Sequence, residues 1–180
     1  MKKKKYLLIS LVVIGCILIF AVVITLSINK NNEESPINCL IESINNKNTI
    51  EIPKAFHEYC SLWIEQNISE KDFNEYIDNI IEDFGNDYKV AYKIVNTEKL
   101  SNNEVESYET NALYTYSNYP YFSNGGEIKF ECIDKITANI TIRGNKQEQN
   151  SNVDFLIVKI DGKFYFLHTP NQLMSMFIRY

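Results

Sequence analysis

The sequence predicts an α+β fold that follows an N-terminal transmembrane helix. Three observations lead to this expectation: a long uncharged apolar run at residues 6–28, helical spacing of apolar residues between 37 and 84, and strand-like alternation at 88–94 and again after 128. The expected order is α-α-α-β-α-β-β-β, with the helices packed on one face of a curved antiparallel sheet. The predicted parts are a basic tip at 1–5, a transmembrane helix at 6–28, a tether at 29–36 and one domain at 37–180.

The apolar run follows four consecutive lysines, Lys2 to Lys5, and contains no charged residue. A helix over residues 6–28 is about 34 Å long, which is enough to cross a hydrocarbon core of about 30 Å. One charge at its centre would cost about 3 kcal/mol. Because basic flanks stay on the cytoplasmic side, we expect the N-terminus in the cytoplasm and the domain outside the cell membrane.

The apolar run has two alternatives to an uncleaved anchor. A cleaved signal peptide has an apolar core of about 7–15 residues followed by small residues, and this run is longer and lacks that ending. The segment Val13-Ile14-Gly15-Cys16 resembles the lipobox of bacterial lipoproteins, in which Cys16 would be lipidated. Polar residues usually follow that cysteine, whereas residues 17–24 stay apolar. The uncleaved anchor is therefore favoured, and processing at Cys16 stays open.

Charge and composition limit the function classes. The net charge is −5, and it becomes −9 when the four lysines of the tip are left out. An acidic domain repels the phosphates of nucleic acid, so no nucleic-acid partner is expected. The sequence has no glycine-rich phosphate loop, Cys-x-x-Cys pair or histidine cluster, so no cofactor or metal is expected. The cysteines are expected to be small buried hydrophobes, with a Cys39–Cys60 disulfide as the alternative.

Caps and turns mark several expected boundaries. Ser69 and Gly85 are expected to begin and end the strongest helix, and a second helix is expected over residues 56–64, just after Pro53. A further helix is expected to begin at Ser101 and Glu104, and a hairpin turn is expected at Asp161-Gly162. Residues 144–152 are expected to form an exposed loop. A bulge or bend is expected where Asp134 interrupts the apolar face of its strand.

The order of elements resembles that of the cone-shaped nuclear transport factor 2-like superfamily. The segment from Val158 to Tyr165, VKIDGKFY, is similar to a hairpin of uncharacterised membrane-anchored or secreted members from Gram-positive bacteria, many of which have Trp at the position of Phe164. The resemblance covers residues 37–168 and implies the cone-shaped fold. Abundant Asn, Lys and Ile are typical of AT-rich genomes, in agreement with such a source. The superfamily includes small-molecule isomerases, dehydratases and cyclases, and many members without catalysis.

Few residues qualify as candidates for a site. Asp134 shares the strand face of Ile136 and Ile140, and a carboxyl buried in an apolar cone would have a raised pKa and could act as a base. A carboxylate held by backbone N–H groups near the sheet edge is favoured over that catalytic role. Asp134, Tyr92 and Tyr116 are the candidates for a ligand pocket inside the cone.

We expect a non-catalytic, membrane-tethered domain that binds a protein, peptide or ligand at the cell surface. His57 and His168 are both expected to be solvated, which leaves little for acid–base catalysis. The tyrosines of residues 108–122 are expected to close the wide end of the cone, with a recognition patch as the alternative. Two other functions are kept: an assembly component of a type IV secretion or conjugation machine, and a small-molecule enzyme that uses the cone pocket.

Overall fold

A computed structural model describes residues 32–67 and 69–167. From Glu33 onward these residues belong to one compact unit. The predicted transmembrane segment at 6–28 lies outside the described residues, as do His168 and the apolar segment after it. Within the described ranges, no helix combines the length and the apolar character that crossing a bilayer requires.

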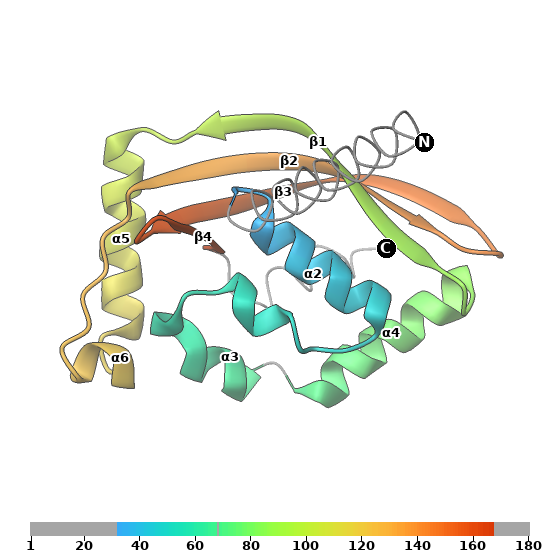
Figure 1. Cartoon of the computed structure of the whole chain (residues 1–180), viewed down its shortest axis with the longest axis horizontal. Coiled ribbons are helices and arrows are strands. Elements are labelled where there is room, and N and C mark those ends of the chain that lie inside the picture. The colour runs from blue at the N-terminus through green and yellow to red at the C-terminus, as the bar shows by residue number, and fades with distance from the viewer. Residues whose placement is uncertain (1–31, 68, 168–180) are drawn as a thin grey trace, which may run out of the picture. The chain divides into compact units, whose positions relative to one another are not determined.

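The domain is an α+β fold with one antiparallel sheet in the order β1-β2-β3-β4 (Figure 1). The strands are β1 (Lys89–Lys99), β2 (Cys132–Arg143), β3 (Glu148–Ile160) and β4 (Lys163–Phe166). The helices are α2 (Ser35–Asn46), α3 (Ser61–Asn67), α4 (Glu70–Phe84), α5 (Asn102–Tyr116) and α6 (Pro120–Ser123), with 3₁₀ turns η2 (Ile52–Ala55) and η3 (Glu58–Cys60). The sequence predicted this order, except for the short helix α6.

The main core lies between α2 and one face of the sheet, and the apolar stripe of α4 joins it. Alternate residues of β2 point into this core, so Ile136, Ala138 and Ile140 are each at most 2% exposed. Ile37 and Ile44 of α2 are fully buried, and α2 packs against β1 and β4. Each fully buried aliphatic side chain stabilises the fold by about 1.5–3 kcal/mol, so this layer fixes the scaffold.

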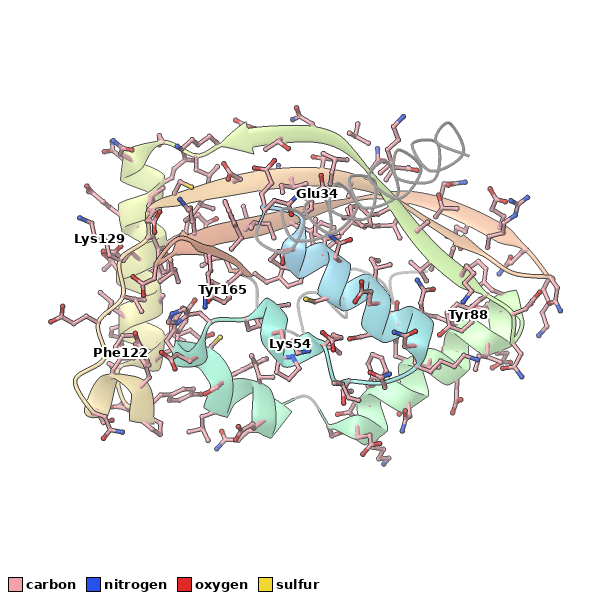
Figure 2. All side chains as sticks on the ribbon, viewed as in Figure 1. Glu34, Lys54, Tyr88, Phe122, Lys129 and Tyr165 are labelled. Carbon is pink, nitrogen blue, oxygen red and sulfur yellow. The ribbon has the colours of Figure 1, made fainter. Side chains whose placement is uncertain are left out.

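Polar contacts fasten α2 to the edge of the sheet at β1. Asn45 Nδ2 donates to Val90 O, and Val90 N donates to Asn45 Oδ1, both at 2.8 Å. The hydroxyl of Tyr88 donates to Ile44 O at 2.7 Å, and Figure 2 shows Tyr88 near the C-terminal end of α2 and Glu34 near its start. An edge strand presents unpaired backbone groups, so Asn45 takes the place of a neighbouring strand at Val90.

Helix α4 begins and ends where the sequence predicted. Ser69 caps it by accepting a hydrogen bond from the backbone N–H three residues on, and Gly85 ends it with φ 98°. The loop between β2 and β3 then closes over the end of this helix, where Lys146 N donates to Phe84 O at 3.2 Å. A Cβ on Gly144 would lie 1.9 Å from Phe84 O, so only glycine allows this approach.

Two other local predictions are confirmed. Ser101 and Glu104 form a reciprocal capping box at the start of α5, with Ser101 N donating to Glu104 Oε2 at 2.9 Å. Asp161 and Gly162 have φ values of 49° and 73° at the turn between β3 and β4. Positive φ at both positions is what a two-residue hairpin of this twist requires.

The strands are longer than predicted because polar residues continue them. The loop expected at 144–152 is wrong beyond residue 147, since β3 begins at Glu148. Across the solvent-facing side of the sheet, Asn139 Nδ2 donates to Asn152 Oδ1 at 2.9 Å and Thr141 Oγ1 donates to Asn150 Oδ1 at 2.5 Å. These cross-strand pairs outweigh the low strand propensity of asparagine.

The bulge predicted at Asp134 is wrong. Asp134 stays in uninterrupted register between Lys99 of β1 and Ile157 of β3, and the irregularity lies instead in β1 between Ile94 and Asn96. Asp134 needs no bulge because it keeps the alternation of its strand near the start of β2. Lys99, its partner in β1, is exposed, so the carboxylate is not enclosed on all sides there.

Both faces of the sheet are covered at its β3–β4 end. Ile157 and Val158 are consecutive in β3, so their side chains point to opposite faces, yet both are 0% exposed. Ile133, which pairs with Val158, is also fully buried, and α5 packs against β2. A second, smaller layer of helices therefore lies on the face opposite the main core.

The chain enters this second layer between Phe56 and His57. The ring of Phe56 lies 5.6 Å from that of Phe166, whereas the ring of His57 lies 5.0 Å from that of Tyr165, the preceding residue of β4. Neighbouring strand residues face opposite sides, so the chain passes around the short edge strand here. Phe56 and His57 are both extended, and for this reason the helix predicted over 56–64 is broken and α3 begins only at Ser61.

Candidate functional site

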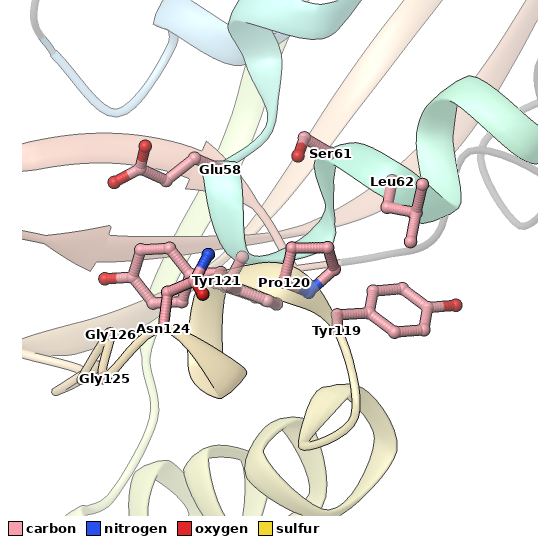
Figure 3. A pocket seen from close by; sticks show the side chains of 10 residues that line it. Glu58, Ser61, Leu62, Tyr119, Pro120, Tyr121, Asn124, Gly125 and Gly126 are labelled. Carbon is pink, nitrogen blue, oxygen red and sulfur yellow. The ribbon is translucent and has the colours of Figure 1, made fainter.

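An open depression of about 480 Å³ lies in the second layer, between η3, α3 and α6 (Figure 3). We call it the tyrosine depression. Its principal lining residues are the aromatic Tyr59, Tyr119 and Tyr121, the apolar Leu62 and Pro120, and the acidic Glu58. Asn124, Gly125 and Gly126 complete the wall.

Helix α6 is a single turn that presents two of these tyrosines. Pro120 occupies its first position, where a missing N–H costs nothing, and Tyr119 precedes it in an extended conformation. The turn closes through a bond of 2.9 Å from Gly126 N to Tyr121 O. A Cβ on Gly126 would lie 2.5 Å from that carbonyl oxygen, so the wall of the depression requires glycine at this position.

The floor of the depression is aromatic core. Tyr59 is 3% exposed, and its ring centroid lies 5.2 Å from that of Tyr116 and 6.2 Å from that of Phe122. Burial raises the pKa of Tyr59 far above its ordinary value and that of Tyr116 to about 12. Both hydroxyls therefore stay neutral at physiological pH.

His57 lies directly behind the depression, and the prediction that it is solvated is wrong. It is 6% exposed, and its Nδ1 accepts a hydrogen bond of 3.2 Å from Tyr59 N, so a neutral ring carries its proton on Nε2. Its ring also meets the edges of Tyr121 and Tyr165 at centroid distances of 5.6 and 5.0 Å. Capping and aromatic packing together bury a residue whose sequence position indicated a helix edge.

Opposing influences act on the pKa of His57. Burial lowers its pKa, and the negative charges of Glu58 and Asp161 raise it, while Lys163 lowers it further. Because burial is the largest influence, the net pKa lies below the ordinary value of 6.5. His57 is neutral at pH 7 and acts here as a cap and packing residue.

Carboxylates dominate the charge near Tyr121. Its hydroxyl donates to the backbone oxygen of Glu127 at 2.8 Å. Burial and then the negative charges of Glu58, Asp161 and Glu127 raise the pKa of this phenol. Within the described part of the chain, the charged groups that act on this phenol are all carboxylates, so its surroundings there are negative.

The predicted candidates Tyr92 and Asp134 do not reach the tyrosine depression. The Tyr92 hydroxyl lies 2.9 Å from Glu34 Oε2 and 2.8 Å from Asn38 Oδ1, where it fixes the start of α2. Asp134 is 8% exposed, and its Oδ2 lies 4.0 Å from Cys132 Sγ. The two share a face of the sheet but are about 20 Å apart, because Tyr92 pairs with the residue six positions beyond Asp134.

Tyr116, the third candidate, does lie beside the depression. It is 8% exposed and stacks between two lining residues, with ring centroids 5.2 Å from Tyr59 and 5.4 Å from Tyr119. Its role in the structure is to support the aromatic floor. Ligand binding by Tyr92, Asp134 and Tyr116 stays a prediction.

Cys39, Cys60 and Cys132 are free thiols in the structure, so no Cys39–Cys60 bond is formed. Cys60 Sγ donates to His57 O at 3.0 Å. Burial raises the pKa of Cys60 to about 12 and also raises that of Cys39, which makes both thiols poor nucleophiles. Across residues 32–67 and 69–167, no group of three or more His, Cys, Asp or Glu side chains could hold a metal ion.

Comparison of the chain with protein-family models and with curated proteins found no match. The site is therefore interpreted from its own residues. Sequence reasoning missed the depression, because its lining comes from two segments about 60 residues apart. The signals that pointed toward it were the tyrosine density of residues 108–122 and the Gly125-Gly126 pair that follows.

Proposed function

We propose that this chain is a membrane-tethered outer domain that binds a protein or peptide partner through the tyrosine depression. The observation that supports this most is the depression itself, an open hollow with tyrosines at its floor and walls. Tyrosine offers a large contact area at small entropic cost and can still donate a hydrogen bond, which is why it is enriched at interfaces. A hollow open to solvent suits one side chain of a larger partner better than an enclosed small molecule.

The placement at the cell surface rests on the sequence. The lysine tip and the apolar run over residues 6–28 support a membrane anchor with the domain outside the cytoplasm. The order of elements supports the resemblance to the nuclear transport factor 2-like superfamily, and with it a curved, cone-shaped sheet. Such a superfamily member without catalysis would serve as a rigid support for a recognition surface.

Cysteine labelling tests the proposed topology. Lys129→Cys places a thiol on the exposed chain after α6, and Lys3→Cys places one in the basic tip. We expect a membrane-impermeant maleimide to label Lys129→Cys on intact cells, above the wild-type background, and Lys3→Cys only after permeabilisation. The reverse pattern, or labelling of neither before permeabilisation, contradicts the placement.

Peptide selection tests the proposed binding site. Peptides from a random library are selected on the full chain in lipid nanodiscs, after removal of those that bind empty nanodiscs. Asn124 is exposed in the wall, so Asn124→Trp fills the depression, whereas Asn118 is exposed just before α6 and does not line it. We expect the selected peptides to lose about tenfold or more in affinity for Asn124→Trp and to bind Asn118→Trp like wild type. Equal binding to both variants, or no enrichment, would sink the proposal.

A cone-pocket enzyme is the alternative that the geometry supports less. It would require Asp134 at an open cavity, and Asp134 is not among the residues that line the tyrosine depression. The assembly role in a secretion or conjugation machine stays a prediction from topology, and a stable complex with other membrane proteins would favour it.

A further inference from the structure

Three carboxylates near the tyrosine depression have no basic partner among residues 32–67 and 69–167. Glu58, Asp161 and Glu127 all act on Tyr121, and none of them takes part in the ion pairs formed within the described part of the chain. Glu131, close by in sequence, differs in that its carboxylate lies 2.8 Å from Lys159 Nζ. Lys163 is the described cation that acts on His57 behind the depression, and it does not line the hollow.

The carboxylate of Glu58 and the ring of Tyr121 lie on the same side of the depression. Figure 3 shows the Glu58 carboxylate and the Tyr121 hydroxyl directed to this side. Pro120 separates these two groups from Tyr119. A guanidinium group can stack on a tyrosine face while it donates hydrogen bonds in its plane to a carboxylate. Aromatic rings without the acid would favour any apolar group, and the acid without the rings would favour any cation.

We propose that the tyrosine depression receives an arginine side chain from a basic segment of a partner protein. This assignment rests on the proposed function, and it adds the chemistry of the occupant. Arginine fits because its charge complements the unpaired carboxylates and its plane matches the tyrosine rings. The charge of −9 on the chain beyond its lysine tip further favours the approach of a basic partner.

Selective labelling of glycine allows a direct test on the full chain in nanodiscs. The sequence has six glycines, so a spectrum of glycine ¹⁵N amides is sparse. Asn124-Gly125 and Gly125-Gly126 are the sole Asn–Gly and Gly–Gly pairs, which lets ¹³C-carbonyl labelling of asparagine or glycine assign both wall residues. The probes are N-acetyl-arginine amide, its neutral isostere N-acetyl-citrulline amide, N-acetyl-lysine amide and N-acetyl-glutamate amide.

We expect N-acetyl-arginine amide to shift the Gly125 and Gly126 amides in a saturable way, and N-acetyl-glutamate amide to leave them in place. The citrulline probe should bind about fivefold or more weakly, because it keeps the shape and loses the charge. The lysine probe should fall between the two, because it is charged but not planar. Equal binding of the arginine and citrulline probes would overturn the assignment.

A pair of variants with equal net charge separates a local contact from general attraction. Glu58→Gln removes the carboxylate of the depression, and Glu65→Gln removes an exposed carboxylate of α3 that does not line it. We expect Glu58→Gln to weaken arginine binding about fivefold and Glu65→Gln to leave it unchanged. Equal effects of the two substitutions would also overturn the assignment.

The arginine assignment and the proposed binding site can fail separately. If selected peptides are blocked by Asn124→Trp but contain no basic residue and ignore Glu58→Gln, the arginine assignment is wrong and the proposed binding site stands. If Asn124→Trp blocks no peptide and the arginine probe does not shift Gly125 or Gly126, the proposed binding site is wrong as well.

Discussion

Replacement of Asn45 by alanine should loosen α2 from the β1 edge of the sheet. Asn45 both donates to and accepts from the backbone of Val90, at 2.8 Å in each case. A hydrogen bond contributes about 1 kcal/mol net, and a buried group left without a partner costs about 1–3 kcal/mol. Asn45 is only partly buried, so water can reach part of the gap. We therefore expect Asn45→Ala to lower the free energy of unfolding by about 2 kcal/mol.

Thermal unfolding of the full chain in detergent micelles measures this loss. Trp63 is the sole tryptophan and packs partly buried against the core, so its fluorescence reports the α+β domain alone. For a domain of roughly 140 residues, 2 kcal/mol corresponds to a decrease in Tm of about 6–8 °C. The amide of Val90 should also exchange its hydrogen faster, since its acceptor is gone.

Asn46→Ala is the matched control, because Asn46 is the next residue of α2 and its side chain is exposed. We expect its Tm to stay near that of wild type or to rise slightly, since alanine favours helices. If Asn45→Ala and Asn46→Ala unfold at the same temperature, the side chain of Asn45 does not replace a strand at this edge, and the reasoning is refuted.

Three further substitutions test other parts of the account by the same unfolding assay. Gly144→Ala should cost about 2–3 kcal/mol, because its Cβ would meet the last carbonyl of α4; a loss no larger than about 1 kcal/mol would contradict this. Ser43→Ala should stabilise the domain by about 1 kcal/mol, because the Ser43 hydroxyl is 0% exposed and has no hydrogen-bond partner among the described residues; a lower Tm would contradict this. The folded state holds the pKa of His57 below 6.5, so the unfolded chain binds a proton at this residue more readily as the pH falls below 6.5. The free energy of unfolding then decreases by at most about 1.4 kcal/mol per pH unit from this group. His57→Asn should flatten that slope between pH 7 and pH 5, and an unchanged slope would show that His57 does not titrate there.

Local sequence signals predicted the elements whose boundaries are set by local chemistry. Ser69, Gly85, Ser101 and the Asp161-Gly162 pair act within a few residues of themselves, so their capping and turn roles could be identified without the fold. The order of helices and strands followed from the same signals and from apolar spacing.

Features that depend on distant partners could not be predicted in this way. The polar start of β3 is a strand because Asn150 and Asn152 meet partners on β2, which the sequence does not place opposite them in advance. The burial of His57 depends on Tyr121 and Tyr165, which arrive from two other segments. The passage of the chain around β4 likewise requires the finished sheet.

Only part of the candidate site could be predicted from the sequence. Tyrosine density drew attention to the segment that contains Tyr119 and Tyr121, although closing the cone was favoured over recognition. The apolar pattern of the sheet indicated a single pocket around Asp134 and Tyr92, and it gave no sign of the second layer. Residues 58–62 meet residues 119–126 because the chain passes around the edge strand β4 between Phe56 and His57, and this passage is visible only in the finished fold.

Cross-linking of a selected peptide to the full chain tests the central claim most directly. The peptide carries a photoreactive diazirine, and the linked residues are identified by mass spectrometry after irradiation in nanodiscs. We expect cross-links within residues 58–62 and 119–126, and their loss when Asn124→Trp fills the hollow. Cross-links confined to the polar outer face of the sheet or to α5, and unchanged by that substitution, would contradict it.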